Sequence, residues 1–588
     1  MKRITPLFLL LAALCIGCAH VSNKSSADNR YERLANDFVT GQFAFDPLTG
    51  VALGWHQYDG RYVVPDQQAL AAEDNRLKRF ESEFAALPAN QLTPVHRHDL
   101  QLLQSTIANE RWAIEVQRVY WLNPMSYAGN GLTIYLKRDF KPLAARVADI
   151  TAIIRQTPAV FAAARSNLQP VLPRPFVETA IEVANGNADF LENDVSKAAA
   201  TVNDPAIRAR FEEAKKIAVA EFRGYADWLN KEKLPTADTS FAVGRDAYIA
   251  MLKSEYIDLT PEQILEIGLR KFHAEQQRFA EAARVIDPTQ SPIEVYKAIQ
   301  REHPTAANLI PDTRKELDGI RQFIIEHHIV TIPSELRPRV EETPPPLRAT
   351  SFASMDTPGP FEEKATEAYY YVTPVEPDWT TKQAEEWLTA FNYYELAVTS
   401  IHEAYPGHYV QFLALNASHA TTVEKVFGSY AYIEGWAHYC EQMLIDQGYA
   451  QPPNPVTASH DELVKAAKYR LAQSDEALLR LCRLCCSIKL HCQGMTVDEA
   501  TRFFMDNCYY EEKPAHSEAV RGTFDPGYLY YTLGKLMILK LRSDWQAQEG
   551  ANYTLQKFHD EFLRHGMPPI PLLRKIMLKD PKQWPKVL

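Results

Sequence analysis

Three side chains that bind metals or move protons stand close together in 401-IHEAYPGHYV-410: His402, Glu403 and His408. Histidine nitrogens are common zinc ligands, and a carboxylate beside them can act as a general base in hydrolysis. The usual helical zinc motif spaces its histidines four residues apart, which places both on one face of a helix. Here the spacing is six, so the two histidines differ by roughly 240° around an undisturbed helix.

A helix break between the two histidines would remove this conflict. Pro406 and Gly407 lie between them. Proline removes a backbone donor and clashes with the preceding turn, while glycine adopts conformations that are closed to other residues. We therefore expect the helix arriving through residues 381–405 to be interrupted here, so that His408 swings back toward the metal.

A second helical stretch, 431-AYIEGWAHYCEQM-443, supplies a third ligand. Three of its side chains fall at i, i+4 and i+7 and so share one face: Glu434, His438 and Glu441. Two histidines and one glutamate form the ligand set of several zinc hydrolases, which keep a fourth position for water. The pattern predicts one Zn²⁺ held by His402, His408 and Glu434, with Glu403 as general base.

Each of these residues also has an ordinary structural explanation. A His–Glu pair in a helix is often a solvated face, and Glu434 and Glu441 could form surface pairs. His438 is more often a satisfied core histidine, or one that orients a ligand, than a ligand itself. Their coincidence with the Pro-Gly break favours the metal site.

The two segments together resemble the DUF885 family of bacterial proteins, whose pattern is HEAxPGH followed by EGWAxYxE. The likeness extends to 47-PLTGVALGWHQYDGR-61 and 518-EAVRGTFDPGYLYYTLGKLMILKLR-542, and so covers most of the chain. It implies a helical zinc metallopeptidase of the gluzincin type, with the ligands and base named above. Tyr409 stands where many members carry a second histidine, so no role is implied for it.

Peptide hydrolysis creates an oxyanion that needs donors beyond the metal. Tyr531, in 530-YYTLGK-535, is the first candidate, although core packing is the alternative for this Tyr-rich run. Three further side chains could bind the oxyanion or a substrate carboxylate: Arg521, His516 and His491. The segment 368-AYYYVTP-374 is either an edge strand that pairs with an extended peptide or part of a small structural hairpin.

The elements that must position these residues are mostly helices. Helical apolar spacing runs through four N-terminal segments: 65–118, 141–166, 174–200 and 204–233. Thr260 and Thr496 each open a further helix, and residues 461–491 form a long one. We expect an all-α fold with a small β element near the site.

The Pro-rich segment 332–360 is the clearest compositional break. It suggests a two-lobed fold around a cleft, within one catalytic domain over 30–588. The N-terminal lobe would span about 30–331 and the metal-binding lobe about 361–588, with a long covering loop between them. A single fused helical fold is the alternative.

The first residues indicate export. Lys2 and Arg3 precede an apolar run that ends at Gly17-Cys18, which predicts a signal peptide over 1–17. Gly17-Cys18 resembles a bacterial lipobox, with Cys18 acylated and 18–29 as a polar tether; a plain signal peptide is the alternative. We expect a lipid-anchored protein on the periplasmic side of the cell envelope, at the outer membrane.

Charge and cysteines narrow the function further. The net charge of −11 argues against a nucleic-acid partner. For the six later cysteines, buried thiols or one local disulfide are favoured over a zinc knuckle at 482–486. The expected activity is zinc-dependent cleavage of short peptides by an oligopeptidase or exopeptidase, including dipeptidyl-carboxypeptidase-like action. The alternatives are an amidase or esterase, or a binding lipoprotein with a structural metal; the presence of Glu403 favours catalysis.

Overall fold

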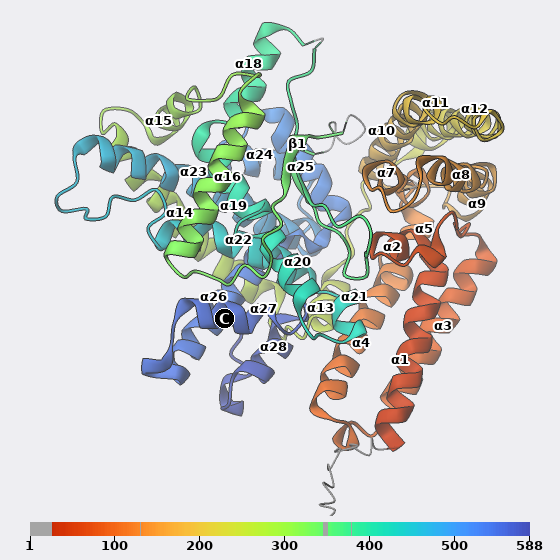
Figure 1. Ribbon diagram of the computed structural model, residues 1–588, viewed down its shortest axis with the longest axis horizontal. Helices are drawn as coiled ribbons and strands as arrows, with labels where there is room; N and C mark the ends of the chain where they lie inside the picture. Colours follow the sequence, from red (N-terminus) through yellow and green to blue (C-terminus); the bar gives the residue numbers. More distant parts are fainter. Residues whose placement is uncertain (1–25, 130, 345–347, 349–350, 378) are drawn as a thin grey trace, which may run out of the picture.

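The computed structural model describes residues 26–129, 131–344, 348, 351–377 and 379–588, and helices dominate it (Figure 1). The expected all-α fold with one small β element is confirmed. The expected signal peptide and Cys18 lie outside the described residues.

The N-terminal helices follow the segments predicted from apolar spacing, because their buried residues recur every three or four positions. The long segment 65–118 is divided by a short connection after residue 85, and the segment 174–200 is helical throughout. The helices are α1 (Ser26–Phe45), α2 (Pro47–Ala52), α3 (Gln67–Ala85), α4 (Pro94–Arg111), α5 (Val119–Leu122), α6 (Met125–Ala128), α7 (Thr133–Lys137), α8 (Leu143–Ile154), α9 (Thr157–Asn167), α10 (Arg174–Phe190), α11 (Ser196–Ala200) and α12 (Pro205–Trp228).

The remaining helices carry the candidate site. They are α13 (Arg245–Ser254), α14 (Pro261–Ile286), α15 (Pro292–Ile299), α16 (Leu309–Glu326), α18 (Thr381–Ala390), α19 (Tyr393–Glu403), α20 (His408–Ala417), α21 (Thr422–Val426), α22 (Tyr430–Asp446), α23 (His460–Cys492), α24 (Val497–Cys508), α25 (Glu512–Phe524), α26 (Tyr530–Glu549), α27 (Leu555–Leu563) and α28 (Ile570–Met577). Capping boxes open α14 at Thr260 and α24 at Thr496, as predicted.

The only sheet within the described ranges has three short strands in the order β1-β3-β2: β1 (Arg339–Glu342), β3 (Tyr369–Val372) and β2 (Ala353–Asp356). β3 pairs in parallel with β1 and antiparallel with β2. The predicted strand within 368–374 therefore exists, but it is central. Both of its edges are occupied, so the idea that it pairs with a substrate peptide is wrong, and the structural hairpin is the correct alternative.

Buried apolar side chains form three clusters. The first is built mainly from residues between 27 and 229. The second and third draw mainly on residues from 241 onward, so α13 to α16 pack with the C-terminal half. In Figure 1 the N-terminal helices α1, α3 and α4 stand to one side of the helices that carry the site. The apolar clusters divide the chain between residues 229 and 241. A lobe boundary within 332–360 stays a prediction.

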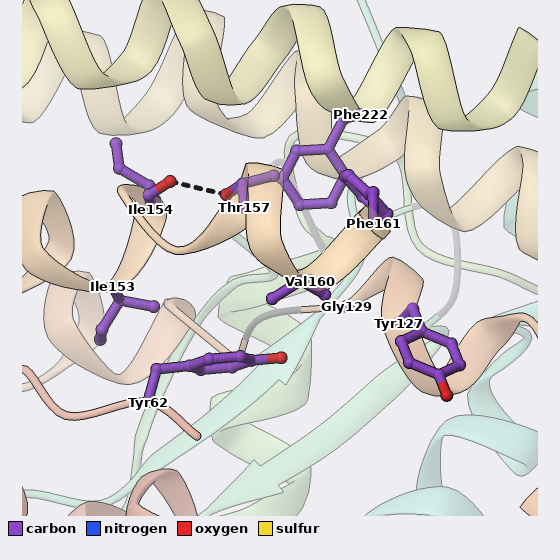
Figure 2. Close-up of a pocket in the computed structure, with 9 residues that line it drawn as sticks. All are labelled: Tyr62, Tyr127, Gly129, Ile153, Ile154, Thr157, Val160, Phe161 and Phe222. Carbon is purple, nitrogen blue, oxygen red and sulfur yellow. Dashed lines mark hydrogen bonds between the residues drawn. The ribbon is translucent and has the colours of Figure 1, made fainter. Parts of the chain in front are cut away.

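A small cavity lies inside the N-terminal helices (Figure 2). Its volume is about 10 Å³, and apolar side chains such as Ile153, Val160 and Phe161 line it. The nearby Thr157 hydroxyl donates to the Ile154 carbonyl at 2.7 Å and so is already satisfied. A space this small holds about one water molecule. It is a packing gap in the core, not a ligand site.

Two further expectations concern the membrane and the thiols. None of the helices in the described ranges combines the length and apolarity needed to cross a bilayer. The six cysteines from Cys440 to Cys508 are free thiols, five of them buried. The preference for buried thiols over a zinc knuckle agrees with this arrangement.

Candidate metal centre

The helix break at Pro406-Gly407 forms as predicted. α19 ends at Glu403 and α20 begins at His408, and the peptide bond before Pro406 is cis. The Gly407 amide donates to the Ile401 carbonyl at 3.0 Å, which folds the chain back over the end of α19. His408 is thereby brought beside His402, with ring centroids 4.9 Å apart.

Gly407 is required for this turn because the backbone passes directly over α19. A Cβ atom added at Gly407 would lie 1.7 Å from the His402 carbonyl oxygen. No side chain fits at that distance. From the other side, the Trp436 indole N–H of α22 donates to the Pro406 carbonyl at 2.9 Å. The turn is thus fixed against α19 and α22, two of the three helices that carry the candidate ligands.

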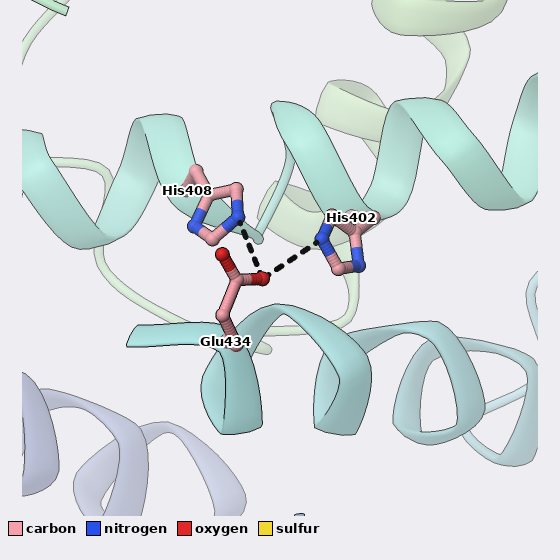
Figure 3. A group of neighbouring side chains, drawn as sticks. All are labelled: His402, His408 and Glu434. Carbon is pink, nitrogen blue, oxygen red and sulfur yellow. Dashed lines mark ion pairs between the residues drawn. The ribbon is translucent and has the colours of Figure 1, made fainter. Parts of the chain in front are cut away.

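The predicted ligands His402, His408 and Glu434 come together (Figure 3). Two imidazoles reach from α19 and α20 toward the Glu434 carboxylate, which rises from α22. Glu434 Oε2 lies 3.5 Å from His402 Nε2 and 3.5 Å from His408 Nε2. The ligand atoms all lie within 4.8 Å of one another, and no other such group of three occurs in the described ranges.

These distances fit a shared zinc ion better than hydrogen bonds. Direct hydrogen bonds of this type are roughly 2.7–3.2 Å long. Zinc ligands at roughly 2.0–2.2 Å in a tetrahedron lie roughly 3.3–3.6 Å from each other, a range that includes the two distances from Glu434 to the histidines. Glu434 Oε2 is buried and has no hydrogen-bond partner of its own. The donor set and its spacing therefore suit Zn²⁺.

The other ring nitrogen of His402 is held by a second carboxylate. Glu441, two turns along α22 from Glu434, accepts from His402 Nδ1 at 2.6 Å. Metal-binding histidines commonly have such a partner, which fixes the tautomer and turns the opposite nitrogen toward the metal. The second oxygen of Glu441 contacts His438 Nδ1 at 2.9 Å, and Arg480 lies 3.5 Å from the first. Glu441 therefore orients a candidate ligand, and His438 supports Glu441.

The charges of this group are strongly coupled. Burial lowers the pKa of His402, but the carboxylates of Glu434 and Glu441 outweigh it and raise the pKa to about 9. Burial raises the pKa of Glu434, yet the neighbouring His408 and His402 hold it well below its usual value. The paired arrangement stabilises positive charge between the rings and the carboxylate, and a divalent cation would take the place of the proton there.

His438 is kept neutral in the same region. Burial and the nearby Lys535 lower the pKa of His438 to about 3, against the opposing effect of Glu441. Burial raises the pKa of Glu441, but Arg480 and His438 hold it well below the usual value. Glu441 is therefore an ionised hydrogen-bond acceptor for His402, and His438 is a buried structural partner.

The proposed base Glu403 is held by the sheet. Its carboxylate accepts from the Met355 backbone N–H of β2 at 3.0 Å. β2 in turn is fixed by the N-terminal half: the Arg138 guanidinium, which follows α7, contacts Asp356 and donates to the Glu367 carbonyl at 3.0 Å. The link between Met355 and Glu403 had no signal in the sequence, because it joins residues 48 positions apart through a loop.

The N-terminal motif around residues 47–61 also supports this strand. Trp55 stacks on Phe361, with ring centroids 4.6 Å apart. His56 lies 3.0 Å from the carboxylate of Glu362 and 3.1 Å from that of Asp59. The contacts with Phe361 and Glu362 hold the chain just after β2 in place. Residues 47–61 thus position the chain that follows β2, and none of them belongs to the group of candidate metal ligands.

Tyr531 lies beside the metal group. Its ring stacks against His402 with centroids 6.4 Å apart and 19° between the planes. The guanidinium groups of Arg483 and Arg521 face the same ring at 5.1 and 5.9 Å. α26 brings it there by close packing on α22, where a Cβ at Gly534 would lie 2.0 Å from the Ala431 carbonyl oxygen. Tyr531 and Arg521 are thus near the site, and Arg483 is a neighbour that the sequence did not reveal.

The other two candidates have structural surroundings. His491 Nε2 contacts the Gly522 carbonyl at 2.8 Å, and its Nδ1 accepts from the Val243 amide. Burial lowers the pKa of His491 to about 4, so it is neutral and both of its nitrogens are used. His516 is exposed on α25, where its only hydrogen-bond partner in the described chain is Thr501. Neither histidine contacts the metal group, and we assign neither to it.

Two solved structures share the fold of this chain. A bacterial structure described as a candidate lipoprotein of unknown function from Shewanella oneidensis has a TM-score of 0.76 and 24% identity, covering 93% of this chain and 100% of that one. A second, from Colwellia psychrerythraea and also described as a candidate lipoprotein, has a TM-score of 0.76 and 17% identity, covering 95% and 99%. These similarities establish the fold, and no curated protein matches the chain. The profile of a family described as a bacterial protein of unknown function, DUF885, matches residues 47–577, so the chain belongs to the DUF885 family.

Proposed function

We propose that this protein is a zinc-dependent hydrolase of the gluzincin type that cleaves short peptides. The observation that carries the proposal is the convergence of His402, His408 and Glu434 at the spacing of zinc ligands. Glu441 orients one of these ligands, and Glu403 adds a carboxylate that such a set does not need for binding alone. A purely structural metal site would require no base beside it.

Zn²⁺, when bound, would acidify a water molecule and polarise the carbonyl that is attacked. Glu403 would take a proton from the attacking water and deliver it to the leaving amine. The Met355 N–H holds the Glu403 carboxylate in position for this transfer. The Tyr531 hydroxyl is our candidate donor to the developing oxyanion, which adjacent Arg483 and Arg521 would further stabilise.

The burial of the site favours short or extended substrates. The side chains of His402, His408 and Glu434 are 8%, 11% and 19% exposed. β2 lies against Glu403, and the N-terminal half fixes β2 in place. A folded protein surface could not reach ligands so enclosed, whereas a peptide end or an unfolded segment could. This supports an oligopeptidase or exopeptidase.

The test is a mixed peptide library digested by the zinc-loaded protein, with cleavage positions read by mass spectrometry. Glu403→Gln should lower turnover roughly 10²- to 10⁴-fold, the usual contribution of a general base, while zinc content stays unchanged. Glu386→Gln, the same change at an exposed residue of α18, is the matched control and should retain full activity. Unchanged turnover in Glu403→Gln would refute the role of Glu403.

The substrate class is tested in the same experiment. Cleavage at a fixed distance from one terminus would establish an exopeptidase. Hydrolysis of simple esters or amides, with no peptide cleaved, would move the assignment to the amidase or esterase alternative. Zinc bound at full occupancy with no turnover on either panel would instead identify a binding protein with a structural metal.

We also propose that the protein is exported and lipid-anchored at Cys18, on the periplasmic side of the outer membrane. The signal-like N-terminus supports this, as does the description of both structural relatives as candidate lipoproteins. Mass spectrometry of the mature N-terminus from membranes should find an acylated Cys18. A Cys18→Ser variant should leave the membrane fraction, and a mature chain that begins elsewhere without lipid would contradict the proposal.

A further inference from the structure

A second cavity lies beside the HEAYPGH turn, and Tyr405 of that turn lines it. Its volume is about 370 Å³, and the rest of its lining comes from the first ten residues of α16 and from residues around β1. Tyr405 is the residue between Ala404 and Pro406, three positions from each candidate histidine ligand. The cavity is therefore attached to the turn that forms the metal group, although none of the ligands lines it.

Tyr405 is unusual because its hydroxyl is buried without a partner. The side chain is 2% exposed, and no group in the described chain meets the hydroxyl at hydrogen-bonding geometry. Arg321 is also buried, at 7% exposed; its Nη2 donates to Glu335 at 2.7 Å, whereas its Nε–H lacks a partner. A buried polar group left unpaired costs roughly 1–3 kcal/mol, so two of them side by side indicate a missing acceptor.

The neighbours of the Tyr405 hydroxyl are donors. Burial and the nearby Tyr409 raise the pKa of Tyr405, while the positive charges of Arg321 and Arg337 act in the opposite direction. A guanidinium group can only donate hydrogen bonds. The Tyr405 hydroxyl can accept one, but its own proton and the Arg321 Nε–H still need an acceptor from outside this set.

The cavity lining carries a surplus of positive charge. Three arginines, Arg314, Arg337 and Arg339, face two carboxylates, Asp318 and Glu341. Arg337 pairs with Asp318 at 2.6 Å, and Arg339 lies 3.9 Å from Glu367. Arg314 donates to the Val340 carbonyl at 2.8 Å and pairs with no carboxylate among the described residues. Its remaining N–H groups are available to a ligand.

We propose that this cavity binds a small oxyanion of the sulfate or phosphate type, held by three groups that line it: Arg314, Arg337 and the Tyr405 hydroxyl. Planar guanidinium groups match the geometry of such anions, and several acceptor oxygens would satisfy the separate donors at once. The space exceeds what a single halide ion needs. The anion would hold Tyr405 in place, and with it the turn that presents His402 and His408. Bound anion would therefore stabilise the metal-binding conformation.

The probe is sulfate, titrated calorimetrically into the zinc-loaded mature protein at low ionic strength. Arg314→Gln should weaken sulfate binding roughly 10- to 100-fold, because a charge-assisted contact is lost. Tyr405→Phe, which keeps the ring, should weaken it roughly 3- to 10-fold. Arg284→Gln, the same change on the exposed surface of α14, should bind sulfate as the unaltered protein does.

Sulfate at the metal group itself must be distinguished from sulfate in this cavity. His408→Ala, which alters the metal group, should still bind sulfate, because His408 does not line the cavity; any loss of affinity would equal the coupling between anion and zinc. Circular dichroism and thermal melting show whether each variant is folded. If Arg314→Gln does not fold, Tyr405→Phe still tests the proposal. The proposal is overturned if the unaltered protein binds no sulfate, if the affinity is the same in Arg314→Gln and Tyr405→Phe, or if His408→Ala abolishes binding.

Discussion

Two buried histidines near helix ends differ in what their ring nitrogens contact. His402, a candidate ligand, is the last residue but one of α19, and His491 is the last but one of α23. A carboxylate, Glu441, holds one nitrogen of His402 and leaves the other facing Glu434. At His491, backbone groups of Val243 and Gly522 occupy both nitrogens. Burial alone therefore does not distinguish a candidate ligand from a structural histidine. The distinguishing feature is whether one ring nitrogen is left free of protein hydrogen bonds.

The largest expected effect is the difference in zinc binding between variants that lack the imidazole of His402 or of His491. His402→Ala deletes a ligand and should reduce zinc affinity by more than the roughly 10- to 100-fold loss typical of an outer partner. Turnover should disappear with the metal. His491→Ala should keep its zinc, which dialysis followed by metal analysis would measure. Equal zinc loss in the two variants would show that His402 and His491 do not differ in their role at the metal.

The aromatic neighbours of the two histidines should differ in the same way. Tyr531 stacks on His402. Near His491 the corresponding ring is that of Tyr248, with ring centroids 6.2 Å apart, and the Tyr248 hydroxyl lies 2.7 Å from the Ser487 hydroxyl. Tyr531→Phe should lower kcat about 100-fold if its hydroxyl serves the oxyanion, with KM little changed. Tyr248→Phe should leave kcat unaltered and serves as the control. A Tyr531→Phe enzyme of normal kcat would assign that ring to packing alone.

The partner carboxylate provides a finer test. Glu441→Gln keeps the size of the side chain but removes the charge that orients His402. Zinc affinity should fall roughly 10- to 100-fold while the ligands themselves remain. Competition with a chelator of known affinity gives the value. An unaltered zinc affinity would show that Glu441 serves only to pair with Arg480 and to hydrogen-bond His438.

The smallest effect is a pH dependence of stability at His491. Its folded pKa of about 4 lies below the unfolded value of about 6.5, so the unfolded chain binds more protons between these values. Stability should therefore fall as the pH decreases from about 6.5 to about 4, by up to about 1.4 kcal/mol per pH unit from this residue. His491→Gln should flatten that part of the curve in denaturant titrations. An identical slope in both proteins would mean that His491 is not buried in its neutral form.

The parts of this molecule that sequence predicts are those with local causes. Thr260 and Thr496 cap their helices because the capping partner is three residues away. The break at Pro406-Gly407 follows from the backbone limits of those two residues, and Glu434 was found because it shares a helix face with Glu441. These features needed only spacing and residue chemistry.

The rest depends on contacts between distant segments. The strand at 369–372 has a clear β pattern, yet its central place depends on β1 and β2, which no local pattern reveals. Arg480 reaches Glu441 from another helix, and Met355 reaches Glu403 from the covering segment. His491 looked like a site residue because its backbone partners, Val243 and Gly522, lie far away in sequence.

The most direct test of the account is the zinc content of the purified, zinc-reconstituted protein beside that of His408→Ala. The spacing of the three ligands predicts about one zinc ion per chain in the unaltered protein and essentially none in His408→Ala after dialysis. Circular dichroism should show that both proteins are folded. A zinc-free unaltered protein, or a His408→Ala variant that keeps its zinc, would contradict the proposed metal centre.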